Sequence, residues 1–217
     1  MKSFLAAVAL TAIASAPAFA TTYSNTTPVV VIDGGETTSS IAIAGVSGNI
    51  TSLTLTLNGL SHTYPDDLVF GLLNEDLGLG FVFMSGAGGS IDISSVNLTF
   101  SDFAAGFLPE SFVGGQITSG TYLPSNYGQY EFTFFDNATS FADYNGFSAN
   151  GAWTLYVDDI FPADGGSLAG GWSLDITTDA VTGPAVPEPA TWAMMIGGFA
   201  LAGAAMRSRA HKVAFAA

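Results

Sequence analysis

The chain has 217 residues, no Cys, and 18 Asp and Glu against 4 Lys and Arg, for a formal net charge of −14. The cations are Lys2, Arg207, Arg209 and Lys212, so residues 21–206 carry every carboxylate and no Lys or Arg. This pattern argues against a nucleic-acid partner, which needs cations to neutralise phosphates, and the lack of Cys excludes disulfides, iron–sulfur clusters and thiol catalysis.

Residues 1–20 have the features of a secretory signal peptide. Lys2 is followed by a short apolar stretch, and the segment ends with Ala18-Phe19-Ala20. A basic start, a short apolar run and an A-x-A end are typical of segments that the secretion machinery recognises and that are then removed. We therefore predict export, with cleavage after Ala20.

Residues 21–177 are predicted to form one β domain, because apolar and polar residues alternate there with a period of two. The alternation is clearest at residues 53–58, 96–101, 153–157 and 172–177. Further strands are predicted at residues 29–32, 40–46, 68–73, 81–84 and 129–135. Such strands have one buried face, on which we place Trp153 and Trp172. About nine or ten short strands without an amphipathic helix predict an all-β, jelly-roll-like two-sheet β-sandwich.

The C-terminal part divides into three segments. Residues 178–189 are Pro-rich and are predicted to be a linker. Residues 190–206 are apolar and would measure about 25 Å as a helix, enough for a thin bilayer, so we predict a single transmembrane helix. Residues 207–217 are basic and are predicted to be a cytoplasmic tail.

This arrangement resembles the PEP-CTERM sorting signal of Gram-negative bacteria. The Pro-Glu-Pro motif, the apolar helix and the basic cluster occur in order, and the residues that carry the motif are Val186, Pro187, Glu188, Pro189, Arg207 and Arg209. In that family an exosortase, a membrane protease-transpeptidase, recognises the signal. The resemblance implies an inner-membrane intermediate, followed by release or attachment at the cell surface.

The β region is similar to the P domain (P/Homo B) that follows the catalytic domain in proprotein convertases and many bacterial subtilisin-like proteases. The motifs that carry this resemblance are His62-Thr63-Tyr64-Pro65-Asp66-Asp67-Leu68, Asn150-Gly151-Ala152-Trp153-Thr154-Leu155-Tyr156-Val157-Asp158-Asp159, and Gly171-Trp172-Ser173-Leu174. The resemblance implies a jelly-roll β-sandwich. No protease domain precedes it in this sequence, so the proteolytic activity of the family is not expected.

Aspartates gather in the Gly-rich turns and suggest a calcium site. Calcium binds carboxylate and carbonyl oxygens on loops, and a domain without cations needs a counter-charge. We predict a Ca²⁺ site at Asp158, Asp159 and Asp164, with Asp67 or Asp102 as further ligands. P domains resemble calcium-binding modules in this respect as well.

These features predict a secreted, non-enzymatic acidic protein that is sorted to the outer surface or to an exopolysaccharide matrix. One alternative is a calcium-dependent carbohydrate-binding or adhesion module. Another is a hydrolase that uses acidic residues, and a further one is an accessory domain for a separately encoded secreted protease. His62 is the single histidine between residues 21 and 206, and no G-x-S-x-G motif accompanies it. We therefore expect His62 to cap a strand beside Tyr64.

Overall fold

The structure, a computed structural model, describes residues 19–110, 115–132, 137–179 and 189–207. The chain divides into two compact units, residues 1–180 and residues 181–217, and each is described by itself. The predicted signal peptide, up to residue 18, and most of the predicted linker lie outside the described residues.

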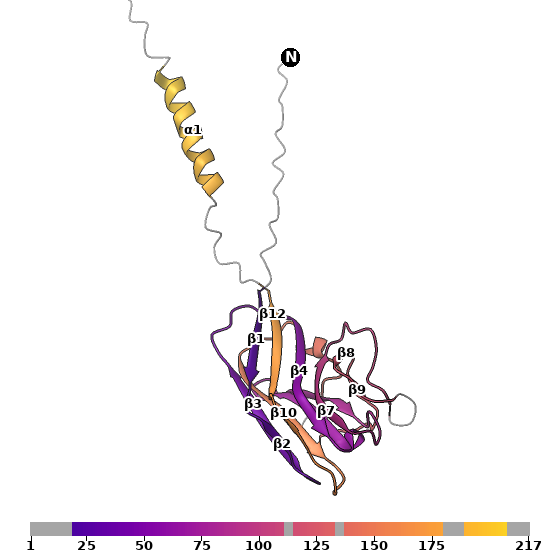
Figure 1. The fold of residues 1–217 in the computed structure, drawn as a ribbon. Helices are drawn as coiled ribbons and strands as arrows, with labels where there is room; N and C mark the ends of the chain where they lie inside the picture. Colours follow the sequence, from indigo (N-terminus) through magenta and orange to yellow (C-terminus); the bar gives the residue numbers. More distant parts are fainter. Residues whose placement is uncertain (1–18, 111–114, 133–136, 180–188, 208–217) are drawn as a thin grey trace, which may run out of the picture. The chain divides into compact units, whose positions relative to one another are not determined.

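The first unit contains two β-sheets (Figure 1). The seven-stranded sheet consists of β1 (Phe19–Asn25), β2 (Val29–Val31), β4 (Ile50–His62), β7 (Ile93–Phe100), β8 (Gly120–Tyr122), β11 (Gly166–Leu168) and β12 (Trp172–Thr178). The five-stranded sheet consists of β3 (Glu36–Ile43), β5 (Leu68–Asn74), β6 (Leu79–Ser85), β9 (Ser125–Asn126) and β10 (Gly151–Asp159). Two short 3₁₀ helices complete the unit, η1 (Pro65–Asp67) and η2 (Phe141–Tyr144).

The central strand of the larger sheet is β4, which pairs with β7 on one side and with β12 and β11 on the other. In the smaller sheet β5 lies between β10 and β6. The pairs are antiparallel except for the two short strands β8 and β9, which pair in parallel with β7 and β6. With 13 residues, β4 is long enough to run from one end of the unit to the other.

One hydrophobic core lies between the two sheets. Alternate residues of β4, such as Leu53, Leu55 and Leu57, are buried in the same cluster as residues of β5 and β6. Trp153 and Trp172 are fully buried, as predicted, and their indole N–H groups donate to the carbonyl of Ala149 and to the hydroxyl of Ser39. Buried indoles need such partners, because an unsatisfied donor destabilises the folded state.

The prediction of a mostly β chain with two sheets is confirmed, whereas the jelly-roll connectivity stays a prediction. The strand predicted at residues 40–46 corresponds to β3, which begins earlier, at Glu36, where it pairs with β10. It also ends earlier, at Ile43, and Gly45 beyond it has a φ of 75° that interrupts extended backbone. The strand predicted at residues 129–135 is wrong for its described part. Gln129 has a φ of 52° there, and only an isolated bridge forms at Phe132.

The predicted signal cleavage point lies inside a strand. Phe19 and Ala20 are the first two residues of β1, paired with Thr178 and Thr177 of β12. Cleavage after Ala20 would therefore shorten β1 by two residues at the edge of the sheet.

The second unit contains the helix α1 (Pro189–Arg207), which covers the residues predicted to be helical. Its side chains from Trp192 to Met206 are apolar or small. Within the described part of the chain, no helix combines the length and apolar character needed to cross a membrane. The predicted membrane span is therefore not confirmed.

Candidate functional site

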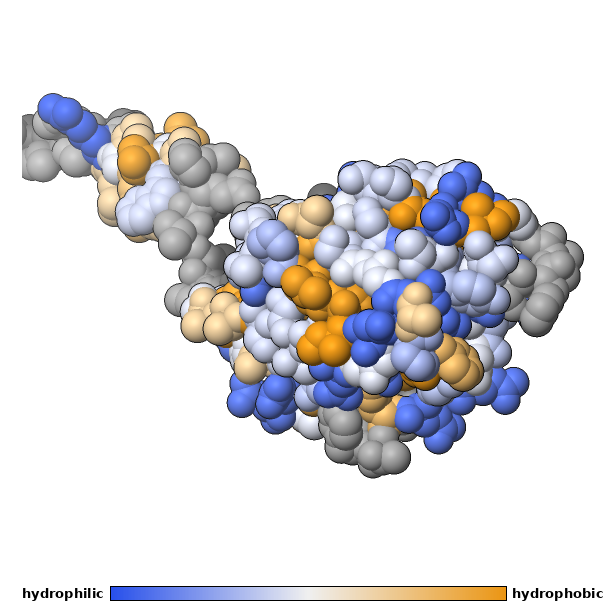
Figure 2. All heavy atoms as spheres, turned by 60° about the horizontal axis from the view of Figure 1, so that its bottom comes forward, coloured by the Kyte–Doolittle hydropathy of each residue, from blue (hydrophilic) through white to orange (hydrophobic). Residues whose placement is uncertain are grey.

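The aspartate-rich turns gather at the end of the sandwich opposite the point where the chain enters and leaves it. β1 begins beside the end of β12, where Phe19 pairs with Thr178, and β4 starts at the same end. At about 3.3 Å per residue, the 13 residues of β4 lead roughly 40 Å to the opposite end. That far end, which we call the distal end, carries the loops of residues 32–35, 63–67 and 160–165. Figure 2 turns it toward the viewer and shows apolar and hydrophilic surface side by side.

His62 and Asp159 form a buried hydrogen-bonded pair at the ends of β4 and β10. The Nε2 atom of His62 lies 3.3 Å from Oδ2 of Asp159, and neither side chain is exposed. The backbone N–H of Tyr64 donates to Nδ1 of His62 at 3.2 Å. A ring nitrogen that accepts a hydrogen bond carries no proton, so this network assigns the ring proton to Nε2, which donates to Asp159.

Both nitrogens of His62 are therefore engaged inside the fold. The prediction that His62 caps a strand beside Tyr64 is confirmed, since β4 ends at His62. A general base needs a ring nitrogen that faces a substrate, and this arrangement offers none at His62.

Gly166 allows β11 to pack closely against this pair. A Cβ atom at Gly166 would lie 2.3 Å from Cδ2 of His62 and 2.3 Å from the carbonyl oxygen of Ser61. No side chain fits at such distances, so the glycine is required by the close approach of the two strands.

Asp67 is the most perturbed carboxyl of the distal end. Only 8% of the residue is exposed, and no described residue donates a hydrogen bond to its carboxylate. Burial, followed by the negative charges of Asp159, Asp164 and Asp66, raises the pKa of Asp67 to about 6, against a smaller opposite effect of His62. Asp67 is therefore a buried carboxyl group with no hydrogen-bond donor among the described residues and no Lys or Arg in the domain to pair with it.

Asp164 lies on the neighbouring loop. Its Oδ1 atom accepts from the hydroxyl of Thr63 at 2.9 Å. The carboxylate of Asp33 accepts from the backbone N–H of Ala163 at 2.8 Å, which joins the two loops of the distal end. The structure thus brings together three of the predicted ligands, Asp67, Asp159 and Asp164.

The other two predicted ligands lie elsewhere. Asp158 follows Val157 on the outer face of β10, and it stands opposite Glu36 of β3. Burial, followed by the charge of Asp159, raises the pKa of Asp158. Asp102 accepts from the backbone N–H groups of Phe141 and Ala142, at the start of η2. Alternation along β10 and the capping of η2 therefore separate these two residues from the cluster.

A calcium site built from all five aspartates does not fit this geometry. Among the described residues, no group of three or more His, Asp or Glu side chains is arranged to hold a metal ion. Within the cluster, the carboxylate oxygens of Asp159 already accept from His62 and from the backbone N–H of Phe161. Calcium at Asp67, Asp159 and Asp164 stays a prediction.

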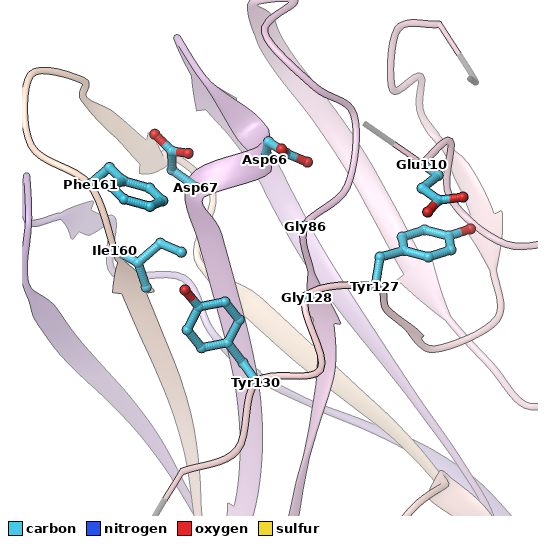
Figure 3. A pocket seen from close by; sticks show the side chains of 9 residues that line it. All are labelled: Asp66, Asp67, Gly86, Glu110, Tyr127, Gly128, Tyr130, Ile160 and Phe161. Atoms are coloured by element: carbon cyan, nitrogen blue, oxygen red, sulfur yellow. The ribbon is translucent and has the colours of Figure 1, made fainter. Parts of the chain in front are cut away.

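A hollow of about 310 Å³ opens beside Asp67 (Figure 3). Figure 3 shows Asp66, Asp67 and Phe161 on one side and Glu110 and Tyr127 on the other. The lining residues are Asp66, Asp67, Gly86, Glu110, Tyr127, Gly128, Tyr130, Ile160 and Phe161. Apart from Asp67, none of these residues was predicted as a site residue. They come from five separate segments of the chain, and no spacing in the sequence indicates that the fold brings them together.

Short hydrogen-bonded contacts fix the loop that carries Tyr130. The side chain of Asn126 accepts from the backbone N–H of Tyr130 at 3.1 Å and donates to its carbonyl at 3.0 Å. The hydroxyl of Ser85 accepts from the backbone N–H of Gly128 at 3.1 Å. Gly128 contacts both groups closely, because a Cβ atom there would lie 2.7 Å from the Tyr130 ring and 2.9 Å from Oγ of Ser85.

The opposite wall is fixed by the buried cluster. The backbone N–H of Ile160 donates to the carbonyl of Asp67 at 3.1 Å, and that of Phe161 donates to the carboxylate of Asp159 at 3.4 Å. Phe161 nevertheless exposes 56% of its surface. On this wall, hydrogen bonds hold the backbone in place, while the ring of Phe161 is exposed.

Comparisons with solved structures give only weak likenesses. A chain of the crystal structure of the Aeromonas sobria serine protease with its chaperone is 15% identical, with 77% of this chain and 27% of that chain covered and a TM-score of 0.38. The crystal structure of the serine protease of Aeromonas sobria is also 15% identical, with 78% and 28% covered and a TM-score of 0.33. This chain spans about a quarter of the length of either. Both TM-scores are too low to support a conclusion, so the P-domain resemblance stays a prediction.

The C-terminal segment gives a specific result. No curated protein matches the sequence. Residues 185–210 match the PEP-CTERM protein-sorting motif, and this range includes all six predicted sorting residues. The chain therefore carries a PEP-CTERM protein-sorting motif directly after its β unit, which supports exosortase-dependent sorting to the cell surface.

Proposed function

We propose that this protein is a non-enzymatic surface protein, which is exported, recognised by an exosortase through residues 185–210, and displayed as an acidic two-sheet β unit. The observation that carries the proposal is the match of residues 185–210 to the PEP-CTERM motif, next to a β unit that ends at β12. Exosortase and the secretion machinery are the partners that this function requires.

The geometry of the β unit supports display at a surface. The chain enters and leaves the unit at one end, and the acidic loops lie roughly 40 Å away along β4. Within the unit, the acidic loops therefore lie away from the end at which β12 finishes. Residues 21–206 carry no Lys or Arg, so this surface repels polyanions and attracts cationic groups.

The non-enzymatic part of the proposal has a physical basis in His62. Both ring nitrogens of that residue are used by backbone and by Asp159 inside the fold. A hydrolase that relies on acidic residues alone would need a pair of carboxyls that face a shared substrate. Hydrolytic activity that disappears in the Asp67→Asn chain would contradict the non-enzymatic proposal.

Sorting is tested in a Gram-negative host, with and without its exosortase. The test variant replaces Pro187, Glu188 and Pro189 by Ala, and the matched control is Pro184→Ala, which lies just outside the motif. We expect the native chain and the control to reach the surface in processed form only when exosortase is present. The triple variant should remain unprocessed in the membrane fraction. Identical distribution of all three chains would contradict the proposal.

Calcium-dependent binding is a second candidate, and the carboxylate of Asp67 is the observation that favours it. That buried group lacks a donor and is repelled by Asp159 and Asp164, so a divalent cation would relieve the repulsion. Calcium should then raise the melting temperature of the native chain, and Asp67→Asn should remove most of this increase. Equal melting temperatures in calcium and in chelator would exclude this candidate and leave the sorting function untouched.

A further inference from the structure

The hollow at the distal end combines carboxylates with aromatic rings, and both kinds of group can bind a cation. Three carboxyl residues, Asp66, Asp67 and Glu110, line it, and so do the aromatic rings of Tyr130 and Phe161. A volume of about 310 Å³ lies at the lower end of the range for sites that hold a small ligand or one large side chain. Carboxylates attract a positive group, and aromatic faces stabilise the same group through their quadrupoles.

The rings and carboxylates stand on walls that are already fixed. The Asn126 side chain holds both backbone groups of Tyr130, and the carboxylate of Asp159 holds the backbone N–H of Phe161. Glu110 is kept in place by an isolated β-bridge to Ala87. A site whose groups are held in place before binding loses less entropy when the ligand arrives.

Asp67 provides an independent indication of a missing positive partner. The residue is more than nine-tenths buried and lines the hollow beside the ring of Phe161, and its carboxylate accepts no hydrogen bond from any described residue. Buried carboxylates are normally paired or hydrogen-bonded. Residues 21–206 contain no Lys or Arg, and both ring nitrogens of His62 already have partners, so a charged group that pairs with Asp67 would come from outside this part of the chain.

An organic cation fits these surroundings better than a bare metal ion or a neutral sugar. Within the described residues, no three His, Asp or Glu side chains are placed to hold a metal. A neutral sugar could stack on Tyr130 or Phe161, but it would leave the charge of Asp67 uncompensated. A protonated amine or a guanidinium group uses the rings and the carboxylates at once.

We propose that this hollow binds a protonated amine or guanidinium group, with Asp67, Asp66 and Glu110 as its anionic partners and the rings of Tyr130 and Phe161 as its aromatic contacts. This binding goes beyond surface sorting and does not depend on it. The ligand is either a free small amine or a basic side chain of another protein, and both offer the same chemistry.

The test is a calorimetric titration of the full chain with 2-phenylethylamine. Its neutral and anionic counterparts, 2-phenylethanol and phenylacetate, have the same ring and almost the same size. We expect saturable binding of the amine, at least tenfold weaker binding of the alcohol and none of the acid. A blocked tripeptide with a single lysine distinguishes the two sources, because tighter binding of the peptide identifies a protein segment and tighter binding of the amine identifies a small molecule.

Variants connect the binding to the hollow. Tyr130→Ala and Phe161→Ala remove partly exposed rings and should each weaken amine binding by about fivefold, in line with a cation–π contact. Asp67→Asn should weaken it by about tenfold, as expected for the loss of a buried ion pair. The matched control Phe103→Ala removes a ring that is 85% exposed and lines no part of this hollow, and it should leave binding unchanged.

Three results would overturn the proposal. The first is equal binding of the amine and the alcohol, which would show that charge has no role. The second is equal binding by the native, Tyr130→Ala and Phe161→Ala chains, with all three folded by circular dichroism. The third is binding of calcium without binding of either ammonium ligand, which would assign the carboxylates to a metal instead.

Discussion

Asp67→Asn is the substitution that most directly tests the electrostatics of the distal end. Burial and the neighbouring carboxylates raise the pKa of Asp67 from its ordinary 3.8 to about 6. Between these pH values the folded chain binds more protons than the unfolded chain at this residue. The free energy of unfolding therefore falls as the pH rises from about 4 to about 7.

The size of the effect follows from the two pKa values. At about 1.36 kcal/mol per pH unit, the interval from 3.8 to about 6 corresponds to about 3 kcal/mol. This contribution of Asp67 to the free energy of unfolding is fully present below about pH 4 and is lost above about pH 7. An amide at position 67 does not titrate. The free energy of unfolding of the variant, relative to that of the native chain, should therefore increase by about 3 kcal/mol as the pH rises from about 4 to about 7.

The assay is urea unfolding of both full chains at several pH values, in chelator and at constant ionic strength. Urea carries no charge, so it leaves the interactions among the carboxylates unscreened. Asp92→Asn serves as the control, because Asp92 is exposed and is outside the distal cluster. A difference between the Asp67→Asn chain and the native chain that stays constant from pH 4 to pH 7.5 would refute the reasoning.

Three further substitutions test the packing and charge around the site by urea unfolding. His62→Phe should lower the free energy of unfolding by about 3 kcal/mol, because it removes the side-chain donor of the buried Asp159 carboxylate, and a loss below about 1 kcal/mol would contradict this. Gly166→Ala should cost about 2 kcal/mol through the clash with the His62 ring, whereas Gly165→Ala, where a Cβ meets nothing within 4 Å, should change little. Asp158→Lys should stabilise the chain by about 0.5 kcal/mol at low salt, because it replaces a repulsive cross-strand pair with Glu36, and a loss at low salt would contradict this.

Most strands could be predicted from the sequence because alternation with a period of two reports burial of one face. β4, β10 and β12 contain the segments predicted in this way, and β7 contains all of its predicted segment except the last residue. The short strands β8, β9 and β11 could not be predicted, because two or three residues are too few to show a period. β1 was not predicted either, and its first two residues, Phe19 and Ala20, also belong to the signal-peptide pattern.

The site was predictable only in part, because its residues are far apart in the sequence and come into contact only in the folded chain. His62 and Asp159 are 97 residues apart, and their contact depends on the ends of β4 and β10 lying together. The neighbouring Asp158 is predicted as a ligand because it belongs to a cluster of aspartates near Gly-rich turns, yet alternation turns it to the opposite face of the strand. The hollow could not be predicted, because Tyr130 and Phe161, whose rings line it, lie in loops without a periodic pattern.

The proposed sorting of this protein to the surface depends on residues 185–210. Its most direct test is the intact mass of the surface-exposed protein, compared between cells with and without exosortase. With the enzyme, we predict a species cut within or near Val186–Pro189, without α1 and the basic tail, and with any covalent group that sorting adds. Without the enzyme, the chain should keep its C-terminus and stay off the surface. A surface protein of the same mass in both strains would contradict the account.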